Sequence, residues 1–351
     1  MNKAMSEIVG GRLQAAAQKL GTANPLQYVG PLLQRTFSYP ADSDVYANNA
    51  LMPGAAAPCE PSFCEQEPNV LRFTIMPLTP DSTPGARRDE ATRAMRKLVG
   101  PLFGNNALRW FDERSEEWRT TGSGARMDFG AFFGTAYDSD GLYASKTYYE
   151  MKPDQLGALP PALRHLVQAA LEHAPNLVPV FTSISCGRSS GGQRVTLYHR
   201  GPLRIADLKP LLARLGLGHQ LPGIMQVIGV SLGGRFDLPE RSVLIGLRET
   251  SEGPEIKLEV MLGRIPDLPP GFIDLLGLGL AERPRELHAL RRWLGAFTPE
   301  ELDWPGRFSV LSIRTTPLTP ARVSLYLRPI EFELSQQIAD GFDLRQSVLT
   351  Q

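Results

Sequence analysis

Short runs rich in Val, Ile, Leu, Tyr and Phe come in pairs along the chain from about residue 70 onward. The two runs of a pair are separated by turn residues, and this pattern predicts a β-hairpin. Most pairs are followed by a segment with the 3.6-residue apolar spacing of an amphipathic helix. The clearest predicted hairpins pair 125–137 with 141–151, 178–186 with 193–201, 241–249 with 254–262, and 307–316 with 321–333.

Helical segments are predicted between and before these hairpins, at 154–173, 205–217, 271–278, 284–296 and within the first 35 residues. The Pro- and Ala-rich stretch from Pro40 to Pro68 keeps no regular period, so we expect a covering loop there. A more degenerate unit combines a strand over 69–78, a helix over 84–103 and a further strand over 108–114.

These units amount to about five hairpins that recur every ~50 to 65 residues, which indicates an internally repeated architecture. Ten antiparallel strands are many for an open sheet, and closure into a barrel removes the exposed edges. The sequence therefore predicts an α+β fold, an antiparallel ten-stranded β-barrel with helices outside it. We expect a single domain over 1–351, with an N-terminal helix and covering loop at 1–68, the repeated barrel at 69–333 and a tail at 334–351.

Composition narrows the possible functions. The 37 basic residues balance the 37 acidic ones, so no overall field attracts nucleic acid or an anionic membrane. No apolar run reaches the ~20 residues of a membrane helix, and the first residues lack the pattern of a signal peptide, so we expect a cytoplasmic protein. The three cysteines and five histidines show no metal-binding spacing, and we expect reduced thiols and no metal site.

Alternation along the second strand of each hairpin separates an aliphatic face from a polar one. Each strand puts a cation on the polar face, and three of the four put a tyrosine there too. The residues of this face are Lys146, Tyr148, Arg194, Thr196, Tyr198, Lys257, Glu259, Arg322, Ser324 and Tyr326. For one strand, a solvated sheet exterior is the simpler explanation. Four such strands, with helices on the aliphatic side, instead predict a shared lumen. Several enclosed cations need an anion such as a diphosphate, and tyrosine rings can stabilise a cation.

Five short motifs on these strands resemble the indole prenyltransferases of the dimethylallyltryptophan synthase type, whose αββα-repeat fold is called the PT barrel. The similarity covers about residues 55 to 330. The motifs are Pro58–Ser62 with Leu71–Leu78, Ser145–Tyr149, Arg194–Tyr198, Glu255–Glu259 and Val323–Tyr326. Three positions depart from the family pattern: Thr196 replaces a diphosphate-binding lysine, Glu259 replaces a shielding tyrosine, and Met76 stands where glutamate usually precedes proline.

The resemblance implies an aromatic prenyltransferase that moves a dimethylallyl or longer prenyl group from an allylic diphosphate to an indole ring such as tryptophan. Glu60 would accept a hydrogen bond from the indole N–H, and Lys146 would take the ring proton. The diphosphate would be bound by Arg72, Lys146, Arg194 and Lys257, and the allyl cation would be shielded by Tyr148, Tyr198 and Tyr326. A role in secondary metabolism, such as alkaloid biosynthesis, is also implied.

The sequence does not support the motifs of other enzyme classes. No aspartate-rich DDxxD sequence is present, so no cofactor is expected and magnesium is expected to be dispensable. The GRSSG sequence at 187–191 matches a hydrolase nucleophile motif, but a strand follows it where that motif needs a helix. Two alternatives stay open: the same barrel prenylating a phenolic, phenazine or peptide-borne ring, and a non-catalytic barrel that carries a hydrophobic ligand.

Overall fold

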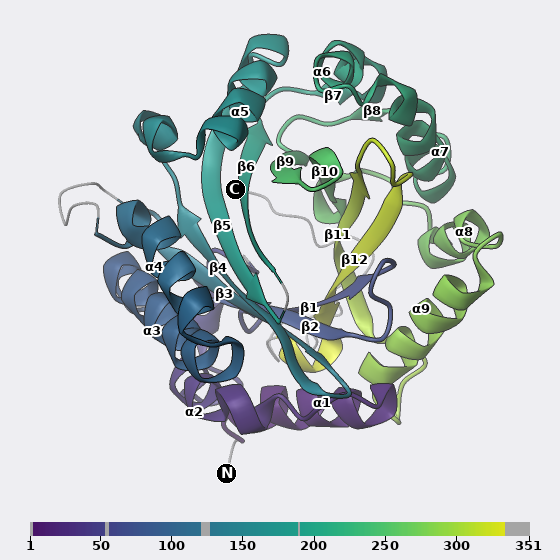
Figure 1. Cartoon of the computed structure of the whole chain (residues 1–351). Coiled ribbons are helices and arrows are strands. Elements are labelled where there is room, and N and C mark those ends of the chain that lie inside the picture. The colour runs from purple at the N-terminus through teal and green to yellow at the C-terminus, as the bar shows by residue number, and fades with distance from the viewer. Residues whose placement is uncertain (1–2, 53–55, 121–126, 189, 334–351) are drawn as a thin grey trace.

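The computed structural model describes residues 3–52, 56–120, 127–188 and 190–333, and the predicted tail at 334–351 lies outside these ranges. Ten strands form a closed barrel in the order β1-β12-β11-β10-β9-β6-β5-β4-β3-β2, and every pair is antiparallel (Figure 1). The predicted α+β barrel is therefore confirmed.

Most barrel strands pair with their sequence neighbours, and two pairings join more distant ones, β6 with β9 and β1 with β12. The barrel strands are β1 Cys59–Cys64, β2 Leu71–Ile75, β3 Ala131–Asp138, β4 Gly141–Glu150, β5 Leu177–Gly187, β6 Gly191–His199, β9 Val243–Thr250, β10 Gly253–Met261, β11 Gly306–Thr315 and β12 Arg322–Pro329. A separate two-stranded sheet consists of β7 Leu203–Arg204 and β8 Asp237–Leu238.

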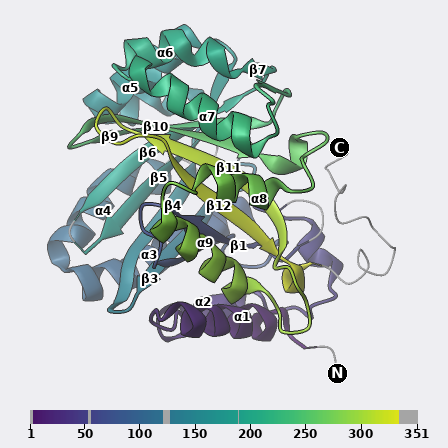
Figure 2. The ribbon, with the colours of Figure 1, turned by 90° about the vertical axis from the view of Figure 1, so that its right-hand side faces the viewer.

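The helices form a layer around the outside of the barrel (Figures 1 and 2). They are α1 Met5–Leu20, α2 Leu26–Thr36, α3 Pro84–Phe103, α4 Asn105–Thr120, α5 Pro161–His173, α6 Lys209–Arg214, α7 Leu221–Ser231, α8 Phe272–Gly279 and α9 Pro284–Phe297. Short 3-10 segments lie at Asp44–Ala47, Pro153–Ala158, Ile205–Leu208, Gly218–Gln220, Leu262–Arg264 and Ile330–Phe332. Within the described ranges, no helix has the length and apolar character needed to span a membrane.

The main hydrophobic core lies between the barrel wall and the helices. The aliphatic strand face supplies fully buried residues such as Leu197, Leu258 and Leu325, and they pack in one cluster with apolar residues of the helices. Because successive strand residues alternate, this outward aliphatic face leaves the cation-and-tyrosine face for the lumen. The arrangement is the one that the alternation predicts.

Two expectations about elements are wrong. The stretch from Pro40 to Pro68 contains a barrel strand, β1, which pairs with β2 and β12. Residues 108–114 belong to helix α4, whose buried Phe111, Ser115 and Trp118 recur at helical spacing and face the barrel. The first hairpin is therefore β1–β2, followed by the helix pair α3 and α4.

The start of β3 is held against α3 by a tight backbone contact. The Glu150 carboxylate accepts hydrogen bonds from the backbone N–H groups of Asp128, Phe129 and Gly130, at 2.8 to 3.0 Å. Gly130 has φ +82°, and a Cβ at this residue would lie 1.9 Å from the carbonyl oxygen of Pro84. Only glycine fits this left-handed turn.

Candidate active site

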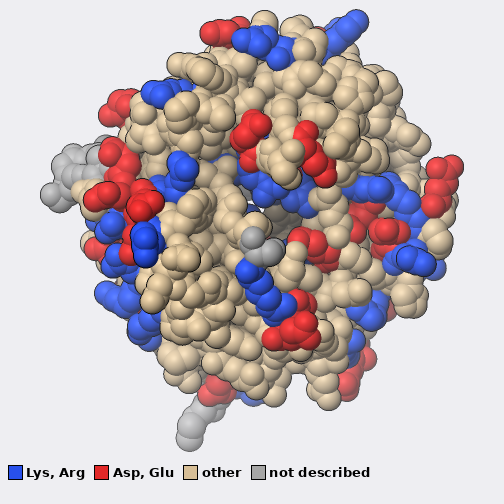
Figure 3. Space-filling model, in the orientation of Figure 1, with Lys and Arg blue, Asp and Glu red and all other residues tan. Residues whose placement is uncertain are grey.

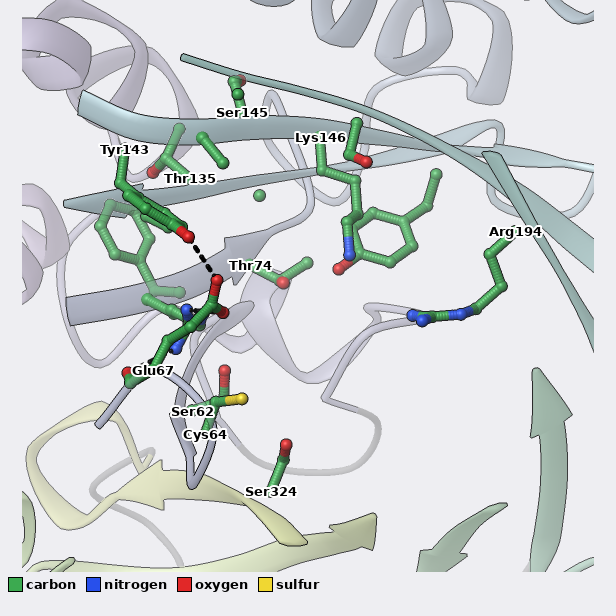
Figure 4. Close-up of a pocket in the computed structure, with 18 of the residues that line it drawn as sticks. Ser62, Cys64, Glu67, Thr74, Thr135, Tyr143, Ser145, Lys146, Arg194 and Ser324 are labelled. Carbon is green, nitrogen blue, oxygen red and sulfur yellow. Dashed lines mark hydrogen bonds and ion pairs between the residues drawn. The ribbon is translucent and has the colours of Figure 1, made fainter. Parts of the chain in front are cut away.

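A cavity of about 380 Å³ lies inside the barrel and is lined by the polar faces of the strands (Figure 4). Its lining within the described residues includes seven cationic side chains, Arg72, Lys146, Arg188, Arg194, Arg248, Lys257 and Arg314. Basic side chains also gather around the hollow in the face of the molecule that Figure 3 shows. The predicted gathering of cations in one lumen is therefore present.

Lys146 extends from β4 into this cavity (Figure 4). Burial and the charges of Arg194 and Lys257 hold its pKa well below the ordinary value. Its Nζ lies 5.3 Å from the centre of the Tyr148 ring, a cation–π contact, and no carboxylate of the described residues forms an ion pair with it. An anion that enters the cavity would restore the favourable environment of a charged ammonium.

Three arginines share one buried carboxylate, that of Glu255 on β10. It accepts a short hydrogen bond from Arg194 and one of 2.8 Å from Arg248, and Arg314 Nε lies 3.9 Å away. Burial opposes ionisation, but the charges of the three arginines lower the pKa of Glu255 to about 2. One negative charge is therefore set against three positive ones.

Arg72 on β2 is paired more completely. Its guanidinium bonds to the carboxylate of Glu67 and donates to the Glu67 carbonyl oxygen at 3.1 Å. The Tyr143 hydroxyl donates to the same carboxylate at 2.5 Å, the contact drawn in Figure 4. At the rim, Arg188 makes two bonds to Asp138, at 2.6 and 2.7 Å.

Glu259 lies in the lumen beside Lys257 and Tyr326. Lys257 Nζ donates to the Glu259 carboxylate and, at 2.7 Å, to the hydroxyl of Tyr326, whose ring centre is 5.2 Å from Nζ. The Glu259 position therefore carries a paired carboxylate where the family pattern has a ring. Thr196 is buried on β6 opposite Gly246 of β9, and it supplies no charge.

An aromatic wall adjoins the cationic part of the lumen. The rings of Phe129 and Phe132 stack with centres 4.5 Å apart, and Tyr148 meets Phe181 edge to face at 5.6 Å. Met76 packs in the same small cluster. Such a wall can accept the flat face of an aromatic ring and the apolar part of a prenyl chain.

Glu60 is buried on β1, and its Oε1 accepts a hydrogen bond of 2.6 Å from the hydroxyl of Ser309. Burial raises the pKa of Glu60 to about 7, with a smaller contribution from the charge of Glu259, while the bond from Ser309 opposes the rise. A carboxyl group of this kind changes its protonation state near neutral pH.

Most of the predicted site residues converge. Six of them line the cavity, namely Arg72, Lys146, Tyr148, Arg194, Lys257 and Tyr326. Glu60 is outside that lining but close enough to Lys257 and Glu259 for their charges to affect its pKa. Tyr198 also lies outside the lining, and its hydroxyl donates to the Arg241 carbonyl oxygen at 3.3 Å.

Sequence reasoning missed Arg248, Arg314 and the carboxylate that joins them. Both arginines lie on the first strands of their hairpins, β9 and β11, and the alternation was applied only to second strands. The signal was present on β9, since Val243, Ile245 and Leu247 form an aliphatic face and Arg248 lies on the opposite one.

No group of three or more His, Cys, Asp or Glu side chains within the described ranges is arranged to hold a metal ion. Magnesium-independent activity nevertheless stays a prediction until it is measured.

Several solved structures share this fold. The 6-dimethylallyltryptophan synthase from Micromonospora olivasterospora, in complex with DMASPP and Trp, is 17% identical, with a TM-score of 0.75 over 95% of this chain and 99% of that chain. PriB with product diphosphate is 16% identical, with a TM-score of 0.70 over 94% and 98%. AnaPT from Neosartorya fischeri is 12% identical, with a TM-score of 0.65 over 93% of each chain. No protein-family model and no curated protein matches the sequence.

The fold of this chain is therefore that of the PT-barrel aromatic prenyltransferases. In particular, its structural neighbours are the indole prenyltransferases that the sequence motifs resemble.

Proposed function

We propose that this protein is an aromatic prenyltransferase that moves a dimethylallyl or longer prenyl group from an allylic diphosphate to an indole ring, such as that of tryptophan or a tryptophan-derived metabolite. The observation that carries the proposal is the surplus of enclosed cations. Within the described residues, Lys146 forms no ion pair with a carboxylate, and the ion pairs of three lumen arginines, Arg194, Arg248 and Arg314, all go to Glu255. A diphosphate supplies the several anionic oxygens that such a cluster requires.

The reaction begins with ionisation of the donor. The bond between the allylic carbon and the diphosphate oxygen breaks, and the diphosphate keeps the electron pair. Arg72, Lys146, Arg194 and Lys257 stabilise that leaving group. The rings of Tyr148 and Tyr326 face the allyl cation, and the barrel wall excludes water that would otherwise capture it.

The acceptor then attacks through a ring carbon. Glu60, as a carboxylate, accepts a hydrogen bond from the indole N–H and raises the electron density of the ring. Lys146 passes its own proton to the released diphosphate and then, as the neutral amine, takes the proton from the alkylated carbon, and aromaticity returns. The lowered pKa of Lys146 supports this assignment because burial and the neighbouring cations favour the loss of its proton.

The alternatives differ in acceptor or in chemistry. A phenolic, phenazine or peptide-borne ring would use the same cations and the same aromatic wall. A carrier of a hydrophobic ligand would need an apolar lumen, and the cationic lining argues against it. The magnesium independence, the cytoplasmic location and the role in alkaloid biosynthesis remain predictions.

The experiment is incubation of purified protein with dimethylallyl diphosphate and a panel of tryptophan, indole dipeptides and phenols, with and without EDTA, read by mass spectrometry. The proposal expects a mass gain of one prenyl unit on an indole and release of diphosphate, in both conditions. Lys146→Ala should lower turnover roughly 100-fold, whereas Lys97→Ala on the outer face of α3 should not. No gain with donors of five, ten or fifteen carbons would overturn the proposal in favour of the carrier.

A further inference from the structure

Arg194, Arg248 and Glu255 lie side by side on three adjacent strands of the barrel. Glu255 on β10 is directly opposite Arg248 on β9. Val195 on β6 pairs with Leu247 on β9, and this register brings Arg194 next to Arg248 across the strand pair. Two like charges in such a cross-strand pair repel each other, so the arrangement needs a compensating group.

A glycine makes room for Arg194. A Cβ at Gly246 would lie 2.8 Å from Cδ of Arg194. Gly246 lies on β9 two residues before Arg248, so it shares the lumen face of that strand. The backbone of β9 therefore leaves space on this part of the wall for the long side chain of Arg194.

Glu255 satisfies the arginines only in part. It neutralises one of three charges, and the Nε atoms of Arg194 and Arg248 are buried without a hydrogen-bond acceptor. Arg314 completes the group from β11, where its Nη2 contacts Cys64 Sγ at 3.4 Å. A purely structural ion-pair network would be expected to match its charges more closely.

We infer that Arg248 binds the donor's diphosphate directly and that Glu255 is a positioning residue, which holds Arg194, Arg248 and Arg314 at fixed orientations toward it. This inference rests on the proposed function. Arg248 also adds to the lumen, from the neighbouring strand β9, a cation that β6 lacks because it carries Thr196 opposite Gly246.

Calorimetry with inorganic pyrophosphate tests the role of Arg248 without any prenyl transfer. Arg248→Ala should weaken pyrophosphate binding roughly 10- to 100-fold, the usual effect of losing a charge-assisted hydrogen-bond donor. Arg248→Lys keeps the charge but loses the planar guanidinium. Its pyrophosphate affinity should therefore lie between that of the wild type and that of Arg248→Ala. The matched control is Arg204→Ala, which removes an exposed arginine that pairs with Asp237 outside the barrel.

The role of Glu255 requires kinetics as well as binding. Glu255→Gln adds net positive charge, so its pyrophosphate affinity should be at least that of the wild type. Its kcat should nevertheless fall at least about tenfold, because the guanidiniums lose their common anchor. A merely structural residue would lower affinity and thermal stability together.

The outcomes separate this inference from the proposed function. Wild-type-like pyrophosphate binding by Arg248→Ala, in a protein that still prenylates an indole, would overturn the inference alone. An unchanged kcat in Glu255→Gln would overturn the positioning role, and if that variant fails to fold, the Arg248 series still decides the binding role. A wild type that neither binds pyrophosphate nor prenylates any acceptor would overturn both.

Discussion

Glu60 is the residue whose chemistry depends most directly on pH. Its pKa of about 7 arises chiefly from burial, and the hydrogen bond from Ser309 keeps the pKa from rising further. Only the ionised carboxylate can accept a hydrogen bond from an indole N–H through either oxygen. Below pH 7 the group is protonated, and as the pH rises through about 7 it becomes the acceptor that the reaction needs.

We therefore expect the kcat/KM for the acceptor to rise through about pH 7, and this rising limb to disappear in Glu60→Gln, with a loss of roughly tenfold or more. Ser309→Ala should move the limb to higher pH, since it removes the bond that lowers the pKa of Glu60. The measurement is a pH–rate profile for the three proteins with saturating donor. An unchanged limb in Glu60→Gln would assign the titration to another group.

At this scale the sequence predicted the cations of the second strands because strict alternation places them on one face. It did not predict their partners. Glu255 is only two residues from Lys257. Its role, however, depends on Arg194 and Arg314, which lie more than 50 residues before it and after it in the chain. Such contacts depend on barrel register, which a single sequence does not specify. For Tyr198 the alternation was correct, but the residue still lies outside the cavity lining.

Among the elements, the β3–α3 junction depends on a single glycine. Gly130 has a positive φ, a Cβ there would lie 1.9 Å from the carbonyl oxygen of Pro84, and its N–H donates to Glu150. Any side chain there must move the start of β3 or the start of α3. Strand β3 is part of the barrel wall around the cavity, and α3 is part of the helical layer outside it.

Gly130→Ala should consequently lower the free energy of unfolding by about 2 kcal/mol or more, through backbone strain and overlap with Pro84. Gly11→Ala in the middle of α1 is the matched control, because its Cβ would meet nothing within 4 Å. That control should raise the stability by up to about 1 kcal/mol. Denaturant unfolding measures both, and equal stabilities would contradict the described geometry.

The hairpins were predictable because each is local, with two apolar runs and a turn. Helix α4 was not, because the run at 108–114 is too short to separate helical spacing from alternation without Trp118. Strand β1 was hidden by Pro61 and by its place in a Pro-rich stretch. Proline removes a backbone donor, so composition argued against a strand that tertiary pairing nevertheless forms.

For the whole molecule, the enclosed cations make stability depend on an anion. Charges of one sign held together in the lumen repel each other, and a multivalent anion relieves that repulsion. Ligand binding to the native state alone raises the unfolding temperature.

Pyrophosphate at 100 times its Kd should raise the Tm by about 4 °C, and monovalent chloride at the same ionic strength should not. Added salt should reduce the pyrophosphate effect, since part of the attraction is screened. Differential scanning fluorimetry across both titrations measures this. An equal shift with chloride would mean that the lumen has no site for a multivalent anion.

The closed barrel itself could be inferred from the number of strands and the need to protect their edges. Helix α7 and the small β7–β8 sheet between β6 and β9 could not, because the hairpin pattern does not show them. The identity of the acceptor and of its alkylated atom also cannot be predicted from the sequence. Both depend on how the cavity places the ring carbon of the acceptor against the allylic carbon of the donor.

The pairing of β1 with β12 has a consequence for biosynthesis. A ribosome makes residues 59–64 early and residues 322–329 some 260 residues later, so the lumen cannot exist on a nascent chain until nearly all of the described sequence has emerged. Until then β1 and β11 each have an unpaired edge, a state that invites aggregation and chaperone binding. A premature stop before Arg322 would therefore yield an open sheet without Tyr326, and no partial catalyst is expected from it.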